Sequence, residues 1–233
     1  MKYETAKKML SWKVQLAIHC CRRKFRVGKG SPPEEMRLIF GIGMHRTGTR
    51  SLSEYLNNLG LRALHWPWWC ERDIGKCLER DNDADVLQLL EPLFYQYDCF
   101  LDVPFSGLFR ELDSRFPLGR FILTTRDSDG WWNSVVRHWK LDDLQSRPLD
   151  PAEFIQYRLY PPRDKTIVSV RDKAIQVAKF ERHNLEVQRY FGKTDKLLVI
   201  DLADTDKNAK VSDFLGMPIR PYPHLGAGEG RHG

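Results

Sequence analysis

The most informative stretch of the chain reads LIFGIGMHRTGTRS at residues 38–51. Its first part, residues 38–43, is a short apolar run of the kind that forms a strand buried on both faces of a parallel sheet. A turn with glycines at positions 43 and 48 follows, and a helix is predicted over residues 51–59. A strand, a glycine-bearing turn and a helix in this order present backbone N–H groups and the positive end of a helix to an anion. The stretch therefore predicts a phosphate-binding loop (P-loop).

The loop lacks the lysine that nucleoside triphosphatases place after the second glycine. Gly43 and Gly48 have the GxxxxG spacing of that motif, but Thr49 and Arg50 stand where it has Lys and Ser or Thr. Arg46, inside the loop, supplies the basic charge instead. Enzymes that transfer phosphate from ATP use the lysine, a hydroxyl and Mg²⁺ to neutralise the β- and γ-phosphates. The loop thus favours a donor with less charge to neutralise than Mg·ATP, and we expect no metal requirement.

The rest of the chain alternates short apolar runs with amphipathic segments, which is typical of an α/β fold. Such a pattern forms a mainly parallel sheet with helices on both faces. We therefore expect a three-layer P-loop fold with a central sheet of about five strands and an N-terminal helical extension. Further strands are predicted at residues 61–66, 99–103, 120–125 and 196–201, and further helices at 83–97, 106–115, 129–141, 167–191 and 207–215. Because ligands in such folds bind at the carboxyl ends of the strands, the residues after each strand are the candidates for the site.

Basic charge is concentrated at the N-terminus of the 233-residue chain. Residues 1–37 carry ten basic and three acidic side chains, a net +7, which leaves −1 of the total +6 for the remainder. We interpret residues 1–36 as a basic helical extension with a linker and residues 37–233 as the P-loop domain. The extension is predicted to contact an anionic membrane surface or a partner, to pack on the domain, or to form a tail. The charge of the domain itself argues against nucleic-acid binding.

The cysteines and the hydropathy favour a cytoplasmic protein. The five cysteines include no CxxC pair, and Cys20 and Cys21 are adjacent, so we expect mostly free thiols in a reducing compartment. No uninterrupted apolar run of about 18 residues is available for a transmembrane helix. The apolar stretch at residues 9–21 is interrupted by polar side chains, and no small-residue cleavage site follows it.

A second anion-binding pattern follows the strand predicted at residues 120–125. Arg126 and Asp127 come directly after this strand, and Ser134 lies eight residues beyond Arg126 on the next helix. A guanidinium group can bind a phosphate through two hydrogen bonds, and a serine hydroxyl can add a third. The alternative is a surface ion pair between Arg126 and Asp127, which would contribute little to stability.

Together, the two segments resemble those of sulfotransferases that use 3′-phosphoadenosine 5′-phosphosulfate (PAPS). In that family a loop of the form [K/R]-[S/T]-G-T-[T/S/R] binds the 5′-phosphosulfate, and an Arg-Asp…Ser segment binds the 3′-phosphate. The similarity covers about residues 38–225 and is greatest to bacterial and lower-eukaryotic members. The matching segments are RTGTRSL at 46–52, DVP at 102–104, FILTTRD at 121–127 with Trp131, and FLGMP at 214–218.

The resemblance implies that PAPS is the donor, that 3′-phosphoadenosine 5′-phosphate (PAP) is released, and that no metal takes part. Arg46 would stabilise the charge on the bridging oxygen as the sulfuryl group leaves. Arg126 and Ser134 would hold the 3′-phosphate. The 5′-phosphate would be bound by the loop residues Thr47, Gly48, Thr49, Arg50 and Ser51.

The resemblance implies two positions for the base that takes the proton of the acceptor. Cytosolic members carry a His two residues before a Pro at the end of the third strand, and Asp102 occupies that place here. Glycosaminoglycan-type members place a Glu at the end of the second strand, where this chain has His65. His45, inside the loop, is a third and weaker candidate. A positioned base contributes about 10²–10⁴-fold to such a reaction, and the choice between Asp102 and His65 stays open.

Three tryptophans, Trp66, Trp68 and Trp69, follow the second predicted strand. They would form a flat apolar wall that suits an aromatic or amphipathic acceptor, with Phe105 completing the pocket. The alternative is a loop packed on the core. We expect a small molecule or glycan as acceptor, with the sulfuryl group moving to a hydroxyl or amine.

Two other functions stay open on the sequence alone. A P-loop kinase acting on a nucleotide or small molecule would share the fold, although the missing GK[ST] argues against it. A non-catalytic nucleotide-binding protein would bind the donor without turnover. The second alternative gains if Asp102 and His65 both point away from the donor.

Overall fold

The computed structural model describes residues 32–79, 83–139, 155, 159–160, 172–192 and 194–225, and all structural statements refer to these residues. The helix predicted in the N-terminal extension and the first part of the helix predicted at 167–191 lie outside them. The division of the chain at residue 36 therefore stays a prediction.

The five strands in the described part of the chain form one parallel sheet in the order β2-β3-β1-β4-β5. This confirms the predicted parallel sheet of about five strands. Strands β2 and β3 lie on one side of β1, and β4 and β5 lie on the other. The direction in which strands are added to the sheet therefore reverses at β1. Such a reversal opens a crevice at the carboxyl ends of the strands, where ligands bind in this class of fold. The strands are β1 (Ile39–Gly41), β2 (Ala63–His65), β3 (Cys99–Leu101), β4 (Arg120–Thr125) and β5 (Leu197–Asp201).

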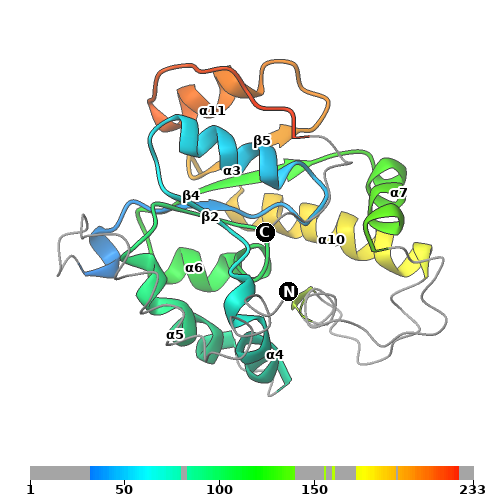
Figure 1. Cartoon of the computed structure of the whole chain (residues 1–233), viewed down its shortest axis with the longest axis horizontal. Coiled ribbons are helices and arrows are strands. Elements are labelled where there is room, and N and C mark those ends of the chain that lie inside the picture. The colour runs from blue at the N-terminus through cyan, green and yellow to red at the C-terminus, as the bar shows by residue number, and fades with distance from the viewer. Residues whose placement is uncertain are drawn as a thin grey trace, which may run out of the picture.

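Helices cover both faces of the sheet, as predicted. In Figure 1, α3 and α11 lie on one side of the strands, and α5, α6 and α10 lie on the other. The described helices are α3 (Thr49–Asn58), α4 (Glu71–Glu79), α5 (Asp83–Phe94), α6 (Phe109–Arg115), α7 (Ser128–Trp139), α10 (Lys173–Phe191) and α11 (Lys207–Leu215). Short 3-10 turns precede α4 and α6, namely η2 (Trp68–Cys70) and η3 (Phe105–Leu108).

The two faces of β1 belong to two different cores because side chains alternate along a strand. Ile39 faces α3 and α11, where it packs with a mostly aliphatic cluster. Phe40 faces the other layer, and its ring stacks on Phe100 at 5.7 Å and on Phe121 at 5.2 Å. The aromatic stack joins the three central strands and holds their carboxyl ends side by side.

The helix α4 is the element that the sequence analysis missed. It was missed because only three of its residues are large and apolar and Gly75 interrupts the pattern. Its buried residues Ile74, Cys77 and Leu78 do have the spacing of one helical face, which was the available signal. None of the described helices has the length and hydropathy needed to cross a bilayer.

The loop after β1 crosses the end of β4 with no space for a side chain at Gly43. A Cβ at Gly43 would lie 2.0 Å from Thr124 Oγ1 and 2.5 Å from the Thr124 carbonyl oxygen. We expect Gly43→Ala to destabilise the protein by about 3 kcal/mol, at the upper end of overpacking costs. That loss lowers the melting temperature by roughly 6–12 °C in a domain of this size, measured by calorimetry or circular dichroism.

Gly60→Ala is the matched control for that substitution. Gly60 has open space around its Cβ position but a φ of +90°, so the same change there costs only the backbone strain of about 1 kcal/mol. Equal losses in the two variants would contradict the close approach of the loop to β4.

Candidate functional site

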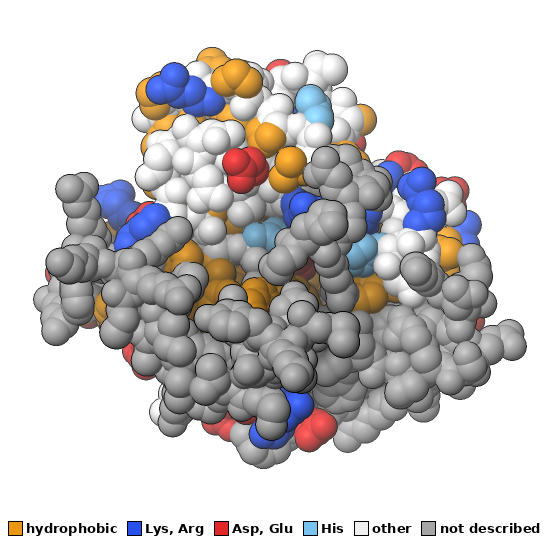
Figure 2. All heavy atoms as spheres, viewed as in Figure 1, with side chains coloured by type: hydrophobic (Ala, Val, Ile, Leu, Met, Phe, Trp, Pro, Cys, Tyr) orange, Lys and Arg blue, Asp and Glu red, His pale blue; other side chains and the backbone are white. Residues whose placement is uncertain are grey.

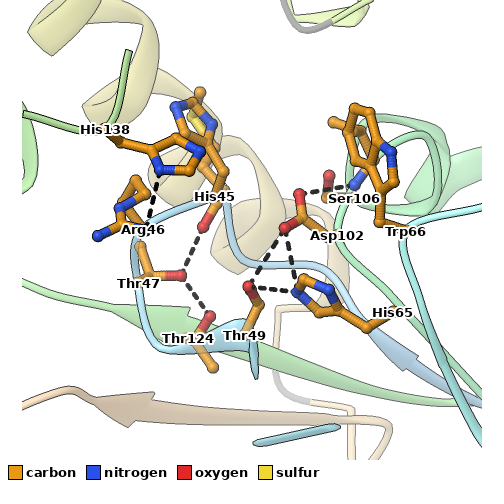
Figure 3. Close-up of polar contacts among 12 residues, drawn as sticks. His45, Arg46, Thr47, Thr49, His65, Trp66, Asp102, Ser106, Thr124 and His138 are labelled. Carbon is orange, nitrogen blue, oxygen red and sulfur yellow. Dashed lines mark hydrogen bonds and ion pairs between the residues drawn. The ribbon is translucent and has the colours of Figure 1, made fainter. Parts of the chain in front are cut away.

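The loop between β1 and α3 is held by its own threonine and by two neighbouring elements (Figure 3). The Thr47 hydroxyl donates to the Met44 carbonyl at 2.6 Å and lies 2.6 Å from the Thr124 hydroxyl on β4. The carbonyl of His45 accepts a hydrogen bond from the Trp131 indole on α7 at 3.0 Å. Gly48, with a φ of +93°, ends the loop and lets α3 begin directly after it. These contacts fix the conformation of the loop at the N-terminus of α3. The helix begins at Thr49, two residues before the start predicted from the sequence.

The two anion-binding segments predicted from the sequence meet in the structure. Arg46 Nε donates to Ser134 Oγ on α7 at 2.9 Å, and its Nη1 lies 3.5 Å from Nδ1 of His138. Arg126 Nη1 donates to the carbonyl oxygen of Arg46 at 3.2 Å. The residue predicted to hold a 5′-phosphosulfate and the pair predicted to hold a 3′-phosphate thus form one continuous site.

The guanidinium groups of Arg46, Arg50, Arg126 and Arg137 lie near one another, and none of them forms an ion pair with a carboxylate of the described residues. Burial lowers the pKa of Arg46, and the positive charges of Arg126, Arg50 and Arg137 lower it further, while the negative charge of Asp102 acts in the opposite direction. Among the described residues, the hydrogen bonds of Arg46, Arg126 and Arg137 go to Ser134, His138 and backbone carbonyls rather than to acids. Arg126 Nε is buried and has no partner. An excess of positive charge of this kind is stabilised by a bound anion.

Arg137 is a basic residue near Arg46 that the sequence analysis did not name. It lies three residues after Ser134 on α7, and its Nε donates to the Asn133 carbonyl at 3.2 Å. Residues three apart on a helix share a face, so the spacing from Ser134 was the signal that could have found it.

Asp102 and His65, which the sequence left as alternatives, lie in direct contact. His65 Nε2 lies 3.2 Å from Asp102 Oδ2, and the Thr49 hydroxyl lies 3.0 Å from His65 Nε2 and 3.3 Å from Asp102 Oδ2. The other carboxylate oxygen of Asp102 accepts from the Val103 backbone N–H at 2.8 Å. The ends of β2 and β3 and the first turn of α3 therefore contribute one hydrogen-bonded group of side chains.

Asp102 is an ionised carboxylate at neutral pH despite its burial. Only 6% of the residue is exposed, and burial by itself would raise the pKa of its carboxyl group. The hydrogen bond and charge of His65, together with the Val103 N–H, reverse that effect and hold the pKa below its usual value. His65 turns Nε2 toward Asp102 and Thr49, and its Nδ1 forms no hydrogen bond with the described residues.

Three residues with left-handed backbone conformations lie just after the carboxyl ends of the strands. Arg46, Trp66 and Asp102 have φ values of 66°, 59° and 68°, and no other non-glycine residue in the described ranges has a positive φ. For a residue with a side chain this conformation costs about 1–2 kcal/mol. Such strain concentrates at binding and catalytic sites, because the surrounding structure must hold it in place.

The tryptophans predicted to line the acceptor pocket follow β2. The Trp66 indole N–H donates to the Glu71 carboxylate at the start of α4. Trp68 is 42% exposed and meets Trp69 edge to face, with ring centroids 5.8 Å apart. Phe105 is fully buried, with its ring 5.1 Å from that of Phe100 in the core. Their roles in binding an acceptor stay predictions.

The C-terminal segment completes the far side of the loop. The backbone N–H of Leu225 donates to the Ser51 hydroxyl at 3.2 Å, and the Tyr222 ring stacks on Tyr55 of α3 at 4.9 Å. Between this segment and the loop lies a small hollow, which the sequence analysis did not predict. Its lining includes Thr47, Gly48, Ser51, Thr124, Asp201, Lys207, Tyr222 and His224.

The side chains of the site gather on one face of the molecule. In Figure 2, basic and histidine side chains lie together near the centre, above a band of hydrophobic side chains. Within the described ranges, no group of three or more His, Cys, Asp or Glu side chains could hold a metal ion. The site thus combines a cluster of arginines, which can bind an anion, with the contact between Asp102 and His65. Hydrophobic side chains lie beside both.

Comparison with known proteins identifies the family. A family model described as a sulfotransferase domain matches residues 38–230. Among solved structures, a sulfotransferase from Alicyclobacillus acidocaldarius is similar, with a TM-score of 0.49, 13% sequence identity and coverage of 87% of each chain. No curated protein matches the sequence.

Two buried histidines give the protein a predictable acid sensitivity. Burial lowers the pKa of both His45 and His183 to about 4, so each ring is neutral in the folded state and binds a proton more readily when unfolded. The free energy of unfolding therefore falls as the pH drops below about 6.5, by about 1.6 kcal/mol per ring between pH 6.5 and pH 5. We expect urea titrations to show this loss and His45→Phe to remove about half of it.

Proposed function

Because the chain belongs to the sulfotransferase domain family, we propose that it moves a sulfuryl group from PAPS to a hydroxyl of a small-molecule or glycan acceptor. The acceptor group could equally be an amine in place of the hydroxyl. The observation that carries it is the group of four arginines at the loop, which has no carboxylate partner in the described part of the chain.

The charge and shape of the loop suit PAPS as the donor. This nucleotide carries negative charge at two places, the 5′-phosphosulfate and the 3′-phosphate. Arg46 and the N-terminal turn of α3 would bind the first, while Arg126 and Ser134 would bind the second. The buried, unpartnered Nε of Arg126 supports this assignment because an anion would satisfy it.

Arg46 would act on the leaving group. PAPS supplies a sulfuryl group whose bond to the 5′-phosphate oxygen breaks as the acceptor oxygen attacks the sulfur. Negative charge develops on the phosphate oxygen, and a guanidinium group held beside it stabilises that charge. Ser134 and His138 hold Arg46 above the loop, so little reorganisation would be needed.

His65 would accept the proton of the acceptor hydroxyl, with Asp102 as a positioning residue. Asp102 holds the Nε2 side of the ring, which keeps the proton on Nε2 and leaves Nδ1 as the basic nitrogen. The ionised carboxylate also stabilises the imidazolium that forms when Nδ1 takes the proton, as in other acid–histidine pairs. The contact of both residues with Thr49 supports a catalytic protein over one that only binds nucleotides.

Nucleotide binding by the purified full chain tests the donor. We expect PAP to bind with micromolar affinity in calorimetry without added metal, and ATP with Mg²⁺ to bind weakly. Arg126→Ala should weaken PAP binding by about 1.5–3 kcal/mol, the value of hydrogen bonds to charged groups.

Arg62→Ala is the matched control for the nucleotide titration, since Arg62 pairs with Asp98 at the amino end of the sheet and should not affect PAP. Tight binding of Mg·ATP without binding of PAP would contradict the proposal and favour a P-loop kinase.

Turnover tests the roles of the acid–histidine pair. We expect His65→Gln and Asp102→Asn each to lower kcat by about 10²–10⁴-fold while PAP affinity stays within about twofold, since both act on the acceptor. Transfer would be followed with labelled PAPS on the best acceptor from a panel of phenols, alcohols and sugars. The control is Asp98→Asn, at the amino end of β3. An unchanged kcat in His65→Gln would exclude His65 as the base.

A further inference from the structure

The ring of His45 has no hydrogen-bond partner although it is almost completely buried. The residue is 8% exposed, and neither Nδ1 nor Nε2 has a hydrogen-bond partner among the residues that the structure describes. The comparison with His183 is direct, because that ring is also buried but places Nε2 2.7 Å from the Ile42 carbonyl. An unsatisfied buried polar group costs about 1–3 kcal/mol, so a partner from outside the chain would relieve the cost at His45.

The surroundings of His45 place its ring among the groups assigned to the reaction. Its carbonyl is fixed by Trp131, and its ring meets Trp131 and Trp139 edge to face at 5.7 and 6.5 Å. The charges that act on it are those of Asp102, His138 and Arg46. Figure 3 shows His45 between Arg46 and His138 on one side and Asp102 on the other. Arg46 would face the leaving group and Asp102 the acceptor side, so His45 lies beside the path of transfer.

We propose that the ring of His45 donates a hydrogen bond to an oxygen of the sulfuryl group and is a further catalytic residue of this protein. The inference rests on the proposed function. A neutral imidazole offers one N–H donor, and the sulfuryl oxygens accept hydrogen bonds. The two indoles that pack on His45 hold the ring in position and limit access of water.

His45 exchanges no proton in this step. The bond from sulfur to the 5′-phosphate oxygen breaks, and that oxygen keeps the electron pair. The bond from sulfur to the acceptor oxygen forms, and the acceptor proton passes to His65. Because burial lowers the pKa of His45 to about 4, its ring is neutral at physiological pH and acts only as a hydrogen-bond donor. A fixed donor in a site of low polarity stabilises charge that shifts during transfer.

Comparison of PAPS and PAP isolates the sulfuryl group, since PAP lacks it. In calorimetry with the full chain and no acceptor, we expect His45→Phe to weaken PAPS binding on the order of 10- to 100-fold. The same variant should change PAP binding by less than about twofold. His45→Gln, whose amide restores a donor, should recover part of the PAPS affinity. Equal effects on both nucleotides, or no effect on either, would overturn the proposal while leaving PAPS as donor.

Thermal unfolding of the ligand-free protein separates this role from a structural one. Phe keeps the aromatic packing on Trp131 and Trp139 and removes two unsatisfied nitrogens, so the melting temperature of His45→Phe should be unchanged or higher. His183→Phe is the control that should lower it, because the Ile42 carbonyl then loses its partner. A melting temperature that falls in His45→Phe as it does in His183→Phe would assign His45 a structural role. Failure of the unsubstituted protein to bind either nucleotide would instead overturn both this inference and the proposed donor.

Discussion

The contact between the backbone of Gly43 and the end of β4 is the constraint on which the site depends. Because no side chain fits between them, the loop can cross the carboxyl end of β4 at close range. That crossing brings Thr47 against Thr124 and places the carbonyl of Arg46 within reach of Arg126. A loop raised by even one methyl group would separate the two anion-binding segments, which lie 80 residues apart in the sequence.

The strand pattern could be predicted from local sequence, and so could the positions of the two segments that we propose to bind an anion. The apolar runs mark all five described strands, and residues 43–51 carry their own signal for a turn and a helix. Arg126 and Ser134 could be found because each stands at a set distance from a strand end. The helix α4 could not be recognised with the same ease, since Gly75 breaks a helical face that has few apolar residues.

The contact between His65 and Asp102 could not be read from the sequence because it depends on strand order. The two residues are 37 positions apart, and they meet only because β2 lies beside β3 with His65 opposite Leu101. If β2 and β3 were not neighbours in the sheet, the two side chains would not meet, and the choice between them would have stayed open. The guanidinium of Arg137 was hidden for a related reason, since its closeness to Arg46 depends on how α7 lies over the loop.

Several unfavourable features of this structure lie at the carboxyl ends of the strands. The left-handed residues Arg46, Trp66 and Asp102, the unpartnered nitrogens of His45 and the repulsion among the arginines each reduce the stability of the ligand-free protein. A purely structural loop would gain from replacing these groups with apolar or oppositely charged ones. A bound anion with oxygen acceptors at two places would neutralise the arginines and provide a partner for the imidazole. Binding of such an anion would recover the stability that these features cost the ligand-free protein, and this recovered free energy would contribute to the affinity for the anion.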